Sequence, residues 1–201
     1  MTTIAVIGAG RVGATLGQRW RELGHDVAFG VRDPSGERAH AVGGVAIADA
    51  VAGAEVVVIA TPFGAVADAI GAAGDLTGKI VVDCTNPIGP DGLLVGTTSS
   101  GAEQVAAHAV GANVVKAFNT TGAENMGDPK YPSGALTMLL AGDDDDAKAT
   151  VAQLASDLGF EPVDLGPLET ARYLEPFAMV WITLAMRQGF GRDIGFTLQR
   201  R

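Results

Sequence analysis

The chain has little of what disulfide-bonded, nucleic-acid-binding and membrane-spanning proteins need. Its one cysteine, Cys84, excludes an internal disulfide and is typical of a reducing cytosol. Its formal net charge of −9 argues against a general nucleic-acid-binding protein. Its longest apolar run, Phe177–Met186, is too short to cross a bilayer. We therefore expect no nucleic-acid or membrane partner and, because a strand pattern begins at Thr3 in place of a signal peptide, a cytoplasmic location.

Groups for acid–base or nucleophilic chemistry are also scarce. The three histidines, His25, His40 and His108, are scattered, and none has a Ser, Cys or carboxylate at a spacing that suggests a dyad. Cys84 ends a buried strand pattern, where a free cysteine usually behaves as a small hydrophobe. Lys116 follows a buried valine pair and is either catalytic or a lysine that snorkels from a strand end. We predict no catalytic side chain.

Four consecutive aspartates, residues 143–146, suggest a metal cluster at first sight. They lie where a strand pattern passes into a helix pattern, so capping of the helix and its dipole explain them without a metal ion. We predict no metal site.

A glycine turn, residues 8–13, is the most informative motif. It reads G-A-G-R-V-G and lies between an apolar strand and a helical segment. Gly8 permits the tight turn, Gly10 lets the backbone approach a pyrophosphate, and Gly13 lets the helix pack on the strand. The helix N-terminus adds free N–H groups and a partial positive charge. This context predicts a dinucleotide site formed by Gly8, Ala9, Gly10, Arg11, Val12 and Gly13.

The second strand pattern, residues 25–32, indicates which dinucleotide. An NAD-binding fold places an acid about 20 residues past the glycines, at the tip of this strand. Here the strand ends on Gly30, and Val31 and Arg32 follow. A small residue leaves room for a 2′-phosphate, and an arginine supplies a planar donor fork for it. We predict NADP(H), with Arg38 as a second contact.

Apolar runs alternate with helical patterns along the whole chain, and with 47% hydrophobic residues the chain can bury one sizeable core but hardly two. The alternation predicts a doubly wound parallel sheet, a Rossmann fold of the α/β class, with a small C-terminal helical extension. Expected strands cover residues 3–7, 25–32, 44–47, 55–60, 79–84, 113–118, 135–140 and 162–165. Expected helices cover residues 14–23, 49–52, 65–73, 143–158 and 170–187, and a further helix is expected just before His108.

Three successive strands end in small, polar or proline-rich loops. In open α/β sheets the ligand crevice lies at these carboxyl ends, so a nicotinamide and a second substrate should meet there. The loops supply Thr61, Pro62, Phe63, Asn86, Pro87, Asn119 and Thr120 as candidate cofactor-binding residues. The helix 170–187 is apolar nearly all round, which predicts burial against the sheet or against a second subunit, and we expect a homodimer.

The chain resembles the coenzyme F420-dependent NADP oxidoreductase family. The matching segments are residues 4–13, 30–32, 60–63, 115–120, 140–144, 165–168 and 171–175. The resemblance implies an enzyme that passes hydride between NADPH and a deazaflavin by direct ring-to-ring transfer. It assigns the pyrophosphate to residues 8–13 and the 2′-phosphate end to Val31 and Arg32.

The same resemblance divides the chain. Residues 1–165 would form the NADP-binding domain, and residues 166–201 a helical segment that closes the acceptor crevice and contributes to a dimer interface. Thr61, Pro62, Asn86 and Pro87 would line the nicotinamide and its ribose. Asn119 and Thr120, with residues 167–174, would border the second ring.

Other functions stay open. The Lys-Ala-Phe-Asn-Thr stretch, residues 116–120, is closer to the branch that resembles the cytosolic domain of metalloreductases, which reduce FMN or FAD with NADPH. A reductase of a small imine or carbonyl compound would need a proton donor, for which only Lys116, Thr120, Thr121 or Tyr173 would serve. A non-catalytic NADPH-sensing module is the third alternative.

Overall fold

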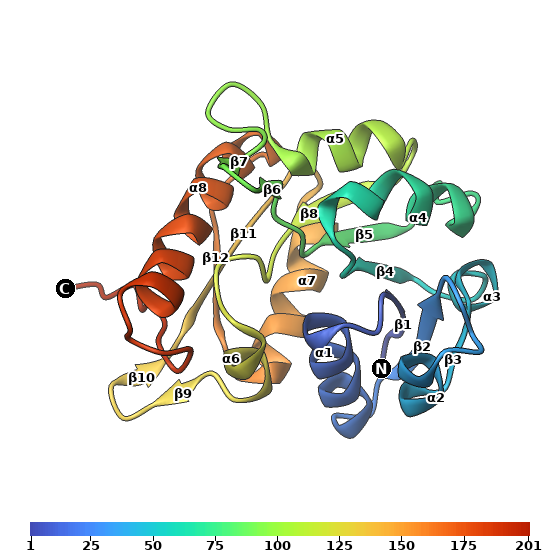
Figure 1. Ribbon diagram of the computed structural model, residues 1–201, viewed down its shortest axis with the longest axis horizontal. Coiled ribbons are helices and arrows are strands. Elements are labelled where there is room, and N and C mark those ends of the chain that lie inside the picture. Colours follow the sequence, from blue (N-terminus) through green and yellow to red (C-terminus); the bar gives the residue numbers. More distant parts are fainter.

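Eight strands form the central sheet of the computed structural model, which describes residues 1–201 (Figure 1). Their order is β12-β11-β8-β5-β4-β1-β2-β3. The bounds are β1 Thr3–Ile7, β2 Asp26–Val31, β3 Gly44–Ala46, β4 Val56–Ile59, β5 Ile80–Asp83, β8 Asn113–Lys116, β11 Thr137–Gly142 and β12 Glu161–Asp164. β1 pairs with β2 on one side and β4 on the other, both in parallel. The order of strands reverses beside β1, and open α/β sheets bind ligands at such a point.

Helices cover both faces of the sheet (Figure 1). They are α1 Arg11–Glu22, α2 Glu37–Val42, α3 Ile47–Val51, α4 Val66–Ala73, α5 Gly101–His108, α6 Ala123–Gly127, α7 Asp145–Leu158 and α8 Ala171–Ile182. Single 3-10 turns, η1 Phe63–Ala65 and η2 Leu168–Thr170, precede α4 and α8, and a π-helical turn, η3 Thr183–Arg187, follows α8. Two short hairpins, β6 Ile88–Gly89 with β7 Gly92–Leu93 and β9 Lys130–Tyr131 with β10 Gly134–Ala135, lie outside the main sheet.

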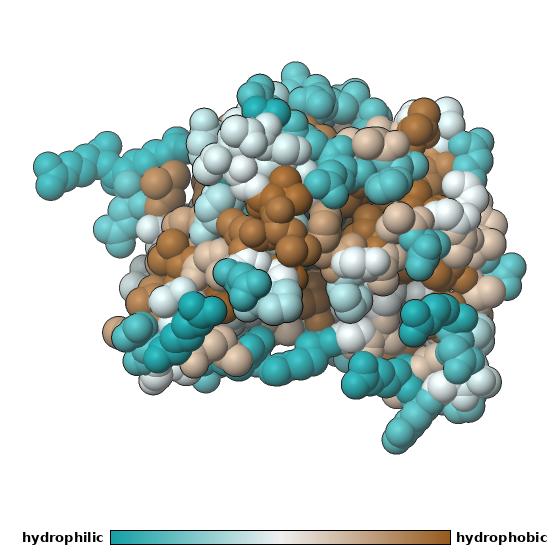
Figure 2. Space-filling model, turned by 45° about the horizontal axis from the view of Figure 1, so that its top comes forward, coloured by the Kyte–Doolittle hydropathy of each residue, from teal (hydrophilic) through white to brown (hydrophobic).

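The core has two halves because alternate residues of each strand point to opposite faces. On β4, Val56 and Val58 join the side chains of α1 and α7, whereas Val57 and Ile59 join those of α3, α4 and α5. Strands buried on both faces appear in the sequence as continuous apolar runs, which is why these strands were predictable. On the face seen in Figure 2, apolar side chains gather around a hollow near the middle.

The expected alternation of strands and helices is confirmed, with two corrections. The sheet is not wholly parallel, because β11 runs antiparallel to β8 and then pairs in parallel with β12. The expected helix over residues 170–187 is not one regular helix. It is α8 with Pro176 inside it, followed by η3.

Three kinds of local structure were not predicted from the sequence. These are α2, α6 and the two hairpins, all short and set in glycine-rich or polar sequence.

The last residues lie along β11 rather than away from the sheet. Thr137 donates its N–H to the carbonyl of Phe196 at 3.0 Å, and Leu198 donates its N–H to Thr137 Oγ1 at 2.8 Å. The ring of Phe196 packs on that of Phe177 from α8, with centroids 4.8 Å apart. The C-terminal segment and α8 therefore cover the same part of the sheet. No helix of the chain has the length and apolarity needed to cross a membrane.

Candidate functional site

The glycine turn has the geometry that a pyrophosphate needs. Gly8 has φ +112°, a conformation that disfavours other residues, and a Cβ there would lie 2.6 Å from the carbonyl oxygen of Ala60. A Cβ on Gly13 would lie 2.1 Å from the carbonyl oxygen of Gly8, so the helix packs directly on the turn. A Cβ on Gly10 would meet nothing within 4 Å. Gly10 is also the N-cap of α1 and supplies no side-chain cap, which leaves the first N–H groups free for an anion.

A cleft of about 700 Å³ opens beside this turn. Eight of the predicted cofactor-binding residues line it: Gly8, Ala9, Gly10, Val31, Arg32, Arg38, Thr61 and Pro62. The hydroxyl oxygen of Thr61 is buried and has no hydrogen-bond partner in the protein, which fits a residue whose partner is a ligand. Open space at Gly10, the uncapped helix and this unpaired hydroxyl together fit a dinucleotide. We name this space the dinucleotide cleft.

Two arginines and one acid lie at the end of the cleft formed by the tip of β2. Arg32 follows β2, Arg38 is on α2, and both line the cleft. Asp33 lines it as well, but its carboxylate accepts hydrogen bonds from Ser35 Oγ at 2.6 Å and Ser35 N–H at 3.0 Å. These bonds hold the pKa of Asp33 below its ordinary value. Asp33 closes a turn, and the arginines remain the free charged groups at this end.

Several further residues of the cleft could not be singled out from local sequence patterns. They come from α2, α3 and α4 and the turn before α2, and they are Gly36, Ala39, Ile47, Ala48, Asp68, Ala69 and Ala72. Most of these residues are small and leave room, but nothing local in the sequence distinguishes the alanines among them from ordinary core alanines.

Asn86, predicted to line the nicotinamide, and Asn119, predicted to border the second ring, bind each other across two loops. Asn86 Nδ2 donates to the carbonyl of Asn119 at 3.0 Å, and Asn119 Nδ2 donates to Asn86 Oδ1 at 3.0 Å. Asn119 Nδ2 also donates to the carbonyl of Leu174 on α8 at 3.1 Å, and its own Oδ1 is buried without a partner. The residue before it, Phe118, has φ +62°, a strained value for a side chain of this size. The loop after β8 is thus bent sharply to bring Asn119 to Asn86.

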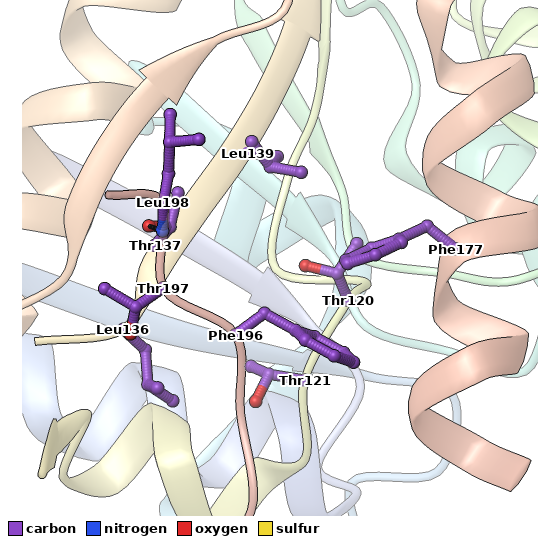
Figure 3. A pocket seen from close by; sticks show the side chains of 9 residues that line it. All are labelled: Thr120, Thr121, Leu136, Thr137, Leu139, Phe177, Phe196, Thr197 and Leu198. Carbon is purple, nitrogen blue, oxygen red and sulfur yellow. Dashed lines mark hydrogen bonds between the residues drawn. The ribbon is translucent and has the colours of Figure 1, made fainter. Parts of the chain in front are cut away.

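A second, smaller pocket of about 280 Å³ lies between this loop, the edge of β11, α8 and the C-terminal segment (Figure 3). Its lining is Thr120, Thr121, Leu136, Thr137, Leu139, Phe177, Phe196, Thr197 and Leu198. We name it the threonine pocket. The rings of Phe177 and Phe196 pack against each other in its wall (Figure 3). Thr120 was predicted as a cofactor-binding residue, and the structure places it here and not in the lining of the dinucleotide cleft.

The other predicted residues lie around these two spaces. Val12 packs against the core below the turn. Arg11 forms an ion pair with Glu124 on α6, so its guanidinium has a protein partner while its backbone begins α1. Phe63 and Pro87 stand close to Gly101, at 2.8 and 3.3 Å from the position that a Cβ on it would take.

Lys116 requires a correction. It does not snorkel from its strand, because its side chain is fully buried and both charged partners, Asp83 and Glu175, are fully buried too. Its ammonium lies 2.8 Å from Asp83 Oδ2 and 2.9 Å from Glu175 Oε1. Burial by itself lowers the pKa of Lys116, but the two carboxylates outweigh burial and the pKa is raised. The lysine stays charged.

The remaining candidates have structural surroundings. Asp144 is the N-cap of α7 and accepts a hydrogen bond from the N–H of Ala147 at 2.8 Å, as capping predicts. Burial raises the pKa of the Cys84 thiol well above its ordinary value, so it remains a protonated core residue. His25 is hydrogen-bonded to Asp157 at 3.1 Å and follows the end of α1 that is remote from the glycine turn. No three His, Cys, Asp or Glu side chains stand close enough to hold a metal ion together.

The uncapped glycine turn and the arginine-bearing cleft beside it have the geometry of a dinucleotide-binding Rossmann protein. Comparison with known proteins is consistent with this class. The family model described as NADP oxidoreductase coenzyme F420-dependent matches residues 3–87. An F420-dependent NADP reductase of Methanothermobacter thermautotrophicus is 30% identical over 92% of this chain and 89% of its own length. The chain therefore belongs to the F420-dependent NADP oxidoreductase family and is an NADP-dependent oxidoreductase.

Two further proteins are similar to it. A crystal structure from Arthrobacter sp. FB24, of a protein provisionally assigned as an F420-dependent NADP-reductase, superposes with a TM-score of 0.91 over the whole of both chains at 35% identity. Metalloreductase STEAP3 of Rattus norvegicus is 31% identical over 86% of this chain, but the chain spans only 35% of the length of that protein.

Proposed function

We propose that the protein catalyses hydride transfer between NADPH and coenzyme F420. The observation that carries the proposal is the lining of the threonine pocket, whose nine residues are threonines, leucines and phenylalanines without one titratable side chain. Direct transfer between two flat rings needs alignment and exclusion of water, and it needs no acid–base group. A carbonyl or imine reductase would need a proton donor there. Of the four candidate donors, only Thr120 and Thr121 line the pocket, and a threonine hydroxyl is a weak acid. Lys116 is fully buried and held by two carboxylates, and Tyr173 is not part of the lining.

The residues of the chain would do four things in this reaction. The free N–H groups at the start of α1 would bind the pyrophosphate, and Arg32 with Arg38 would bind the 2′-phosphate. The loop residues Thr61 and Pro62 would fix the nicotinamide end of the cleft. Phe177 and Phe196, with the hydroxyls of Thr120 and Thr121, would hold the acceptor ring and exclude water.

The cofactors would supply the redox chemistry. Bound NADPH would supply a hydride, and the deazaflavin would take it together with a proton from solvent, which would leave NADP⁺ and the reduced deazaflavin.

A flavin in place of F420 is the second candidate. It is supported by the 31% identity to the rat metalloreductase over 86% of this chain. The F420 assignment is preferred because this chain matches 89% of the archaeal F420-dependent enzyme but only 35% of the metalloreductase. Most of the metalloreductase lies outside the region of similarity.

The deciding experiment mixes purified protein with NADPH and offers F420, FMN, FAD and ferric chelates one at a time. The loss of NADPH is followed by its absorbance. Turnover with F420 alone supports the proposal. Turnover only with FMN or FAD, with or without iron, moves the protein to the flavin-reductase branch. Tight NADPH binding without turnover of any acceptor would contradict both and favour an NADPH-sensing module.

Residues 166–201 are proposed to close the acceptor site, because Phe177 and Phe196 both line the threonine pocket. The homodimer also remains a prediction. α8 buries one face and leaves Tyr173 and Val180 exposed on the other, and Met186 and Phe190 after it are exposed too. A compact monomer by sedimentation at micromolar concentration would exclude the dimer. We expect the enzyme to act in the cytoplasm, in keeping with the single, protonated cysteine.

A further inference from the structure

Three buried charges join three separate elements below the loops of the site. Lys116 ends β8, Asp83 ends β5 and Glu175 is on α8. The ammonium of Lys116 uses all three of its hydrogens, on Asp83 Oδ2 at 2.8 Å, Glu175 Oε1 at 2.9 Å and the carbonyl of Thr85 at 2.6 Å. Asp83 Oδ1 accepts from the N–H and the hydroxyl of Thr85, at 2.9 and 2.7 Å. We name Lys116, Asp83 and Glu175 the ion triad.

Glu175 extends the network to a fourth element. Its Oε2 accepts the N–H of Gly101 at 2.8 Å and its Oε1 the N–H of Ala102 at 3.0 Å, so it holds the first turn of α5. The positive end of that helix offsets the second carboxylate of the triad. Gly101 is in turn packed against Phe63 and Pro87, two of the predicted cofactor contacts.

Each member of the triad is close in sequence to a residue that holds the Asn86–Asn119 pair together. Asp83 is three residues before Asn86, and Lys116 is three residues before Asn119. The carbonyl that accepts from Asn119 Nδ2 belongs to Leu174, the residue before Glu175. The two loops and α8 are thus fixed to a common point next to the amide pair.

Stability alone is a poor reason for this arrangement. Removing three charges from water costs more than their mutual attraction returns in many proteins, and well-packed apolar residues of the same volume are often as stable or more so. What the triad does provide is a unique geometry, because each of its bonds is directional and every hydrogen of the ammonium is used.

We propose that Lys116, Asp83 and Glu175 are positioning residues for the nicotinamide. They hold the Asn86 and Asn119 loops and α8 in one register, so that the nicotinamide ring is immobilised against the acceptor pocket. The inference rests on the proposed function for its kinetic effect, but not for its effect on bound NADPH. The adenine end of the cleft, with Arg32 and Arg38, is formed by other elements and is independent of the triad.

The test uses Glu175→Gln and Asp83→Asn in the full chain. In the wild type, two backbone N–H groups of α5 donate to the carboxylate of Glu175. In Glu175→Gln, one of them would face the amide N–H₂, which cannot accept a hydrogen bond. Asp83→Asn keeps the acceptor for Thr85 and presents an amide N–H₂ to Lys116. Both remove one negative charge from a triad that has two carboxylates for one lysine. Both should therefore fold more readily than a Lys116 variant, which would leave two buried carboxylates without a cation.

Three quantities are measured on each folded variant. They are the affinity for 2′-phospho-ADP, which reports the adenine end alone, the fluorescence anisotropy of the bound NADPH nicotinamide, and kcat with the acceptor that the wild type uses. We expect unchanged 2′-phospho-ADP affinity, lower nicotinamide anisotropy and a kcat reduced about tenfold or more, since small misplacements of reacting groups have such effects. KM for NADPH should change far less than kcat.

Lys148→Met is the matched control. Lys148 is also a nearly buried lysine between two carboxylates, Asp145 at 3.1 Å and Asp164 at 2.8 Å, but it is on α7 and lines neither the dinucleotide cleft nor the threonine pocket. It should lose stability and leave anisotropy and kcat unchanged.

Several results would overturn the proposal. One is that the folded triad variants keep the nicotinamide anisotropy and the kcat of the wild type. Another is that they lose affinity for 2′-phospho-ADP as much as they lose kcat. An equal kcat loss in Lys148→Met, or failure of both triad variants to fold, would assign the triad a structural role only. If the wild type turns over no acceptor, the proposed function fails, whereas the anisotropy comparison still decides the role of the triad.

Discussion

Gly13 lies so close to Gly8 that a side chain on it would stand 2.1 Å from the Gly8 carbonyl oxygen. Gly10, between them, has open space where its side chain would be. The three glycines of one turn are therefore needed for different reasons. Gly8 and Gly13 permit the fold of the turn, and Gly10 keeps clear a volume that the protein itself does not use.

Gly13→Ala and Gly10→Ala should accordingly behave differently. Gly13→Ala forces α1 away from β1 and should lower the melting temperature as well as NADPH binding. Gly10→Ala should leave the melting temperature of the free protein nearly unchanged and weaken NADPH binding strongly, because its methyl group occupies the approach to the pyrophosphate. Thermal unfolding and NADPH titration of both variants make the comparison. Unchanged NADPH affinity in folded Gly10→Ala would contradict the placement of the pyrophosphate.

Arg32→Ala should separate the two nicotinamide cofactors. A charged hydrogen bond to a phosphate is worth about 1.5–3 kcal/mol, so the Kd for NADPH should rise about tenfold or more. The Kd for NADH, which has no 2′-phosphate, should change little. Arg187→Ala removes an exposed arginine of η3 and serves as the control. An equal loss for NADH and NADPH in Arg32→Ala would mean that Arg32 does not contact the 2′-phosphate.

Phe118 combines a buried ring with a strained backbone, and its substitutions should show both. Its ring contacts those of Trp20 and Phe160 edge to face, with centroids 5.7 and 6.3 Å away, so Phe118→Ala should cost about 3–5 kcal/mol of unfolding free energy. The backbone at position 118 has φ +62°, a conformation that glycine adopts freely. The Phe118→Gly variant should therefore be no less stable than the Phe118→Ala variant.

Val115 provides the comparison for Phe118. It is equally buried but lies in the regular part of β8, where glycine is less stable than alanine by about 0.5–1 kcal/mol. Urea unfolding of the four variants gives the two differences. If glycine is as unfavourable at position 118 as at 115, the backbone there is not strained.

The ion pair between α5 and α8 should make the free energy of unfolding depend on pH in the acidic range. Glu103 accepts from Arg172 Nε at 2.9 Å and Nη2 at 2.7 Å, and these bonds, with one from Ser100, hold the pKa of Glu103 below 4.5. A lowered folded pKa means that the carboxylate stabilises the fold above the ordinary pKa and that the benefit is lost as the pH falls through the folded value.

The measurement compares the urea midpoints of wild type and Glu103→Gln from neutral pH downward. The wild type should be the more stable above pH 4.5 and the two should converge in acid. Glu22→Gln, in an exposed pair on α1, should differ little from wild type. A constant difference between wild type and Glu103→Gln across the range would show that the charge of Glu103 does not matter.

The glycine turn and the strands were predictable because both are local. A turn that needs φ above zero requires glycine at fixed positions, and strands covered on both faces require continuous apolar residues. The N-cap at Asp144 was predictable for the same reason, since the cap and the N–H that it binds are three residues apart.

The ion triad was not predictable in this way. Lys116 follows two valines, and nothing near it in the sequence distinguishes a buried lysine from one that reaches solvent. Its partners are 33 and 59 residues away, on β5 and α8. The antiparallel direction of β11 was missed for a related reason. An apolar run predicts a strand but does not indicate whether that strand runs parallel or antiparallel to its neighbour.

Residues close together in the chain were enough to establish the class of the fold, the position of the dinucleotide turn and the arginine beside it. The folded chain was needed to show that Asn86 binds Asn119, that Thr120 lines a separate pocket closed by the C-terminal segment, and that Lys116 is buried between two carboxylates. Each of these depends on which strand ends and helices meet at the carboxyl edge of the sheet. Packing of the whole chain sets that arrangement, and no local pattern encodes it.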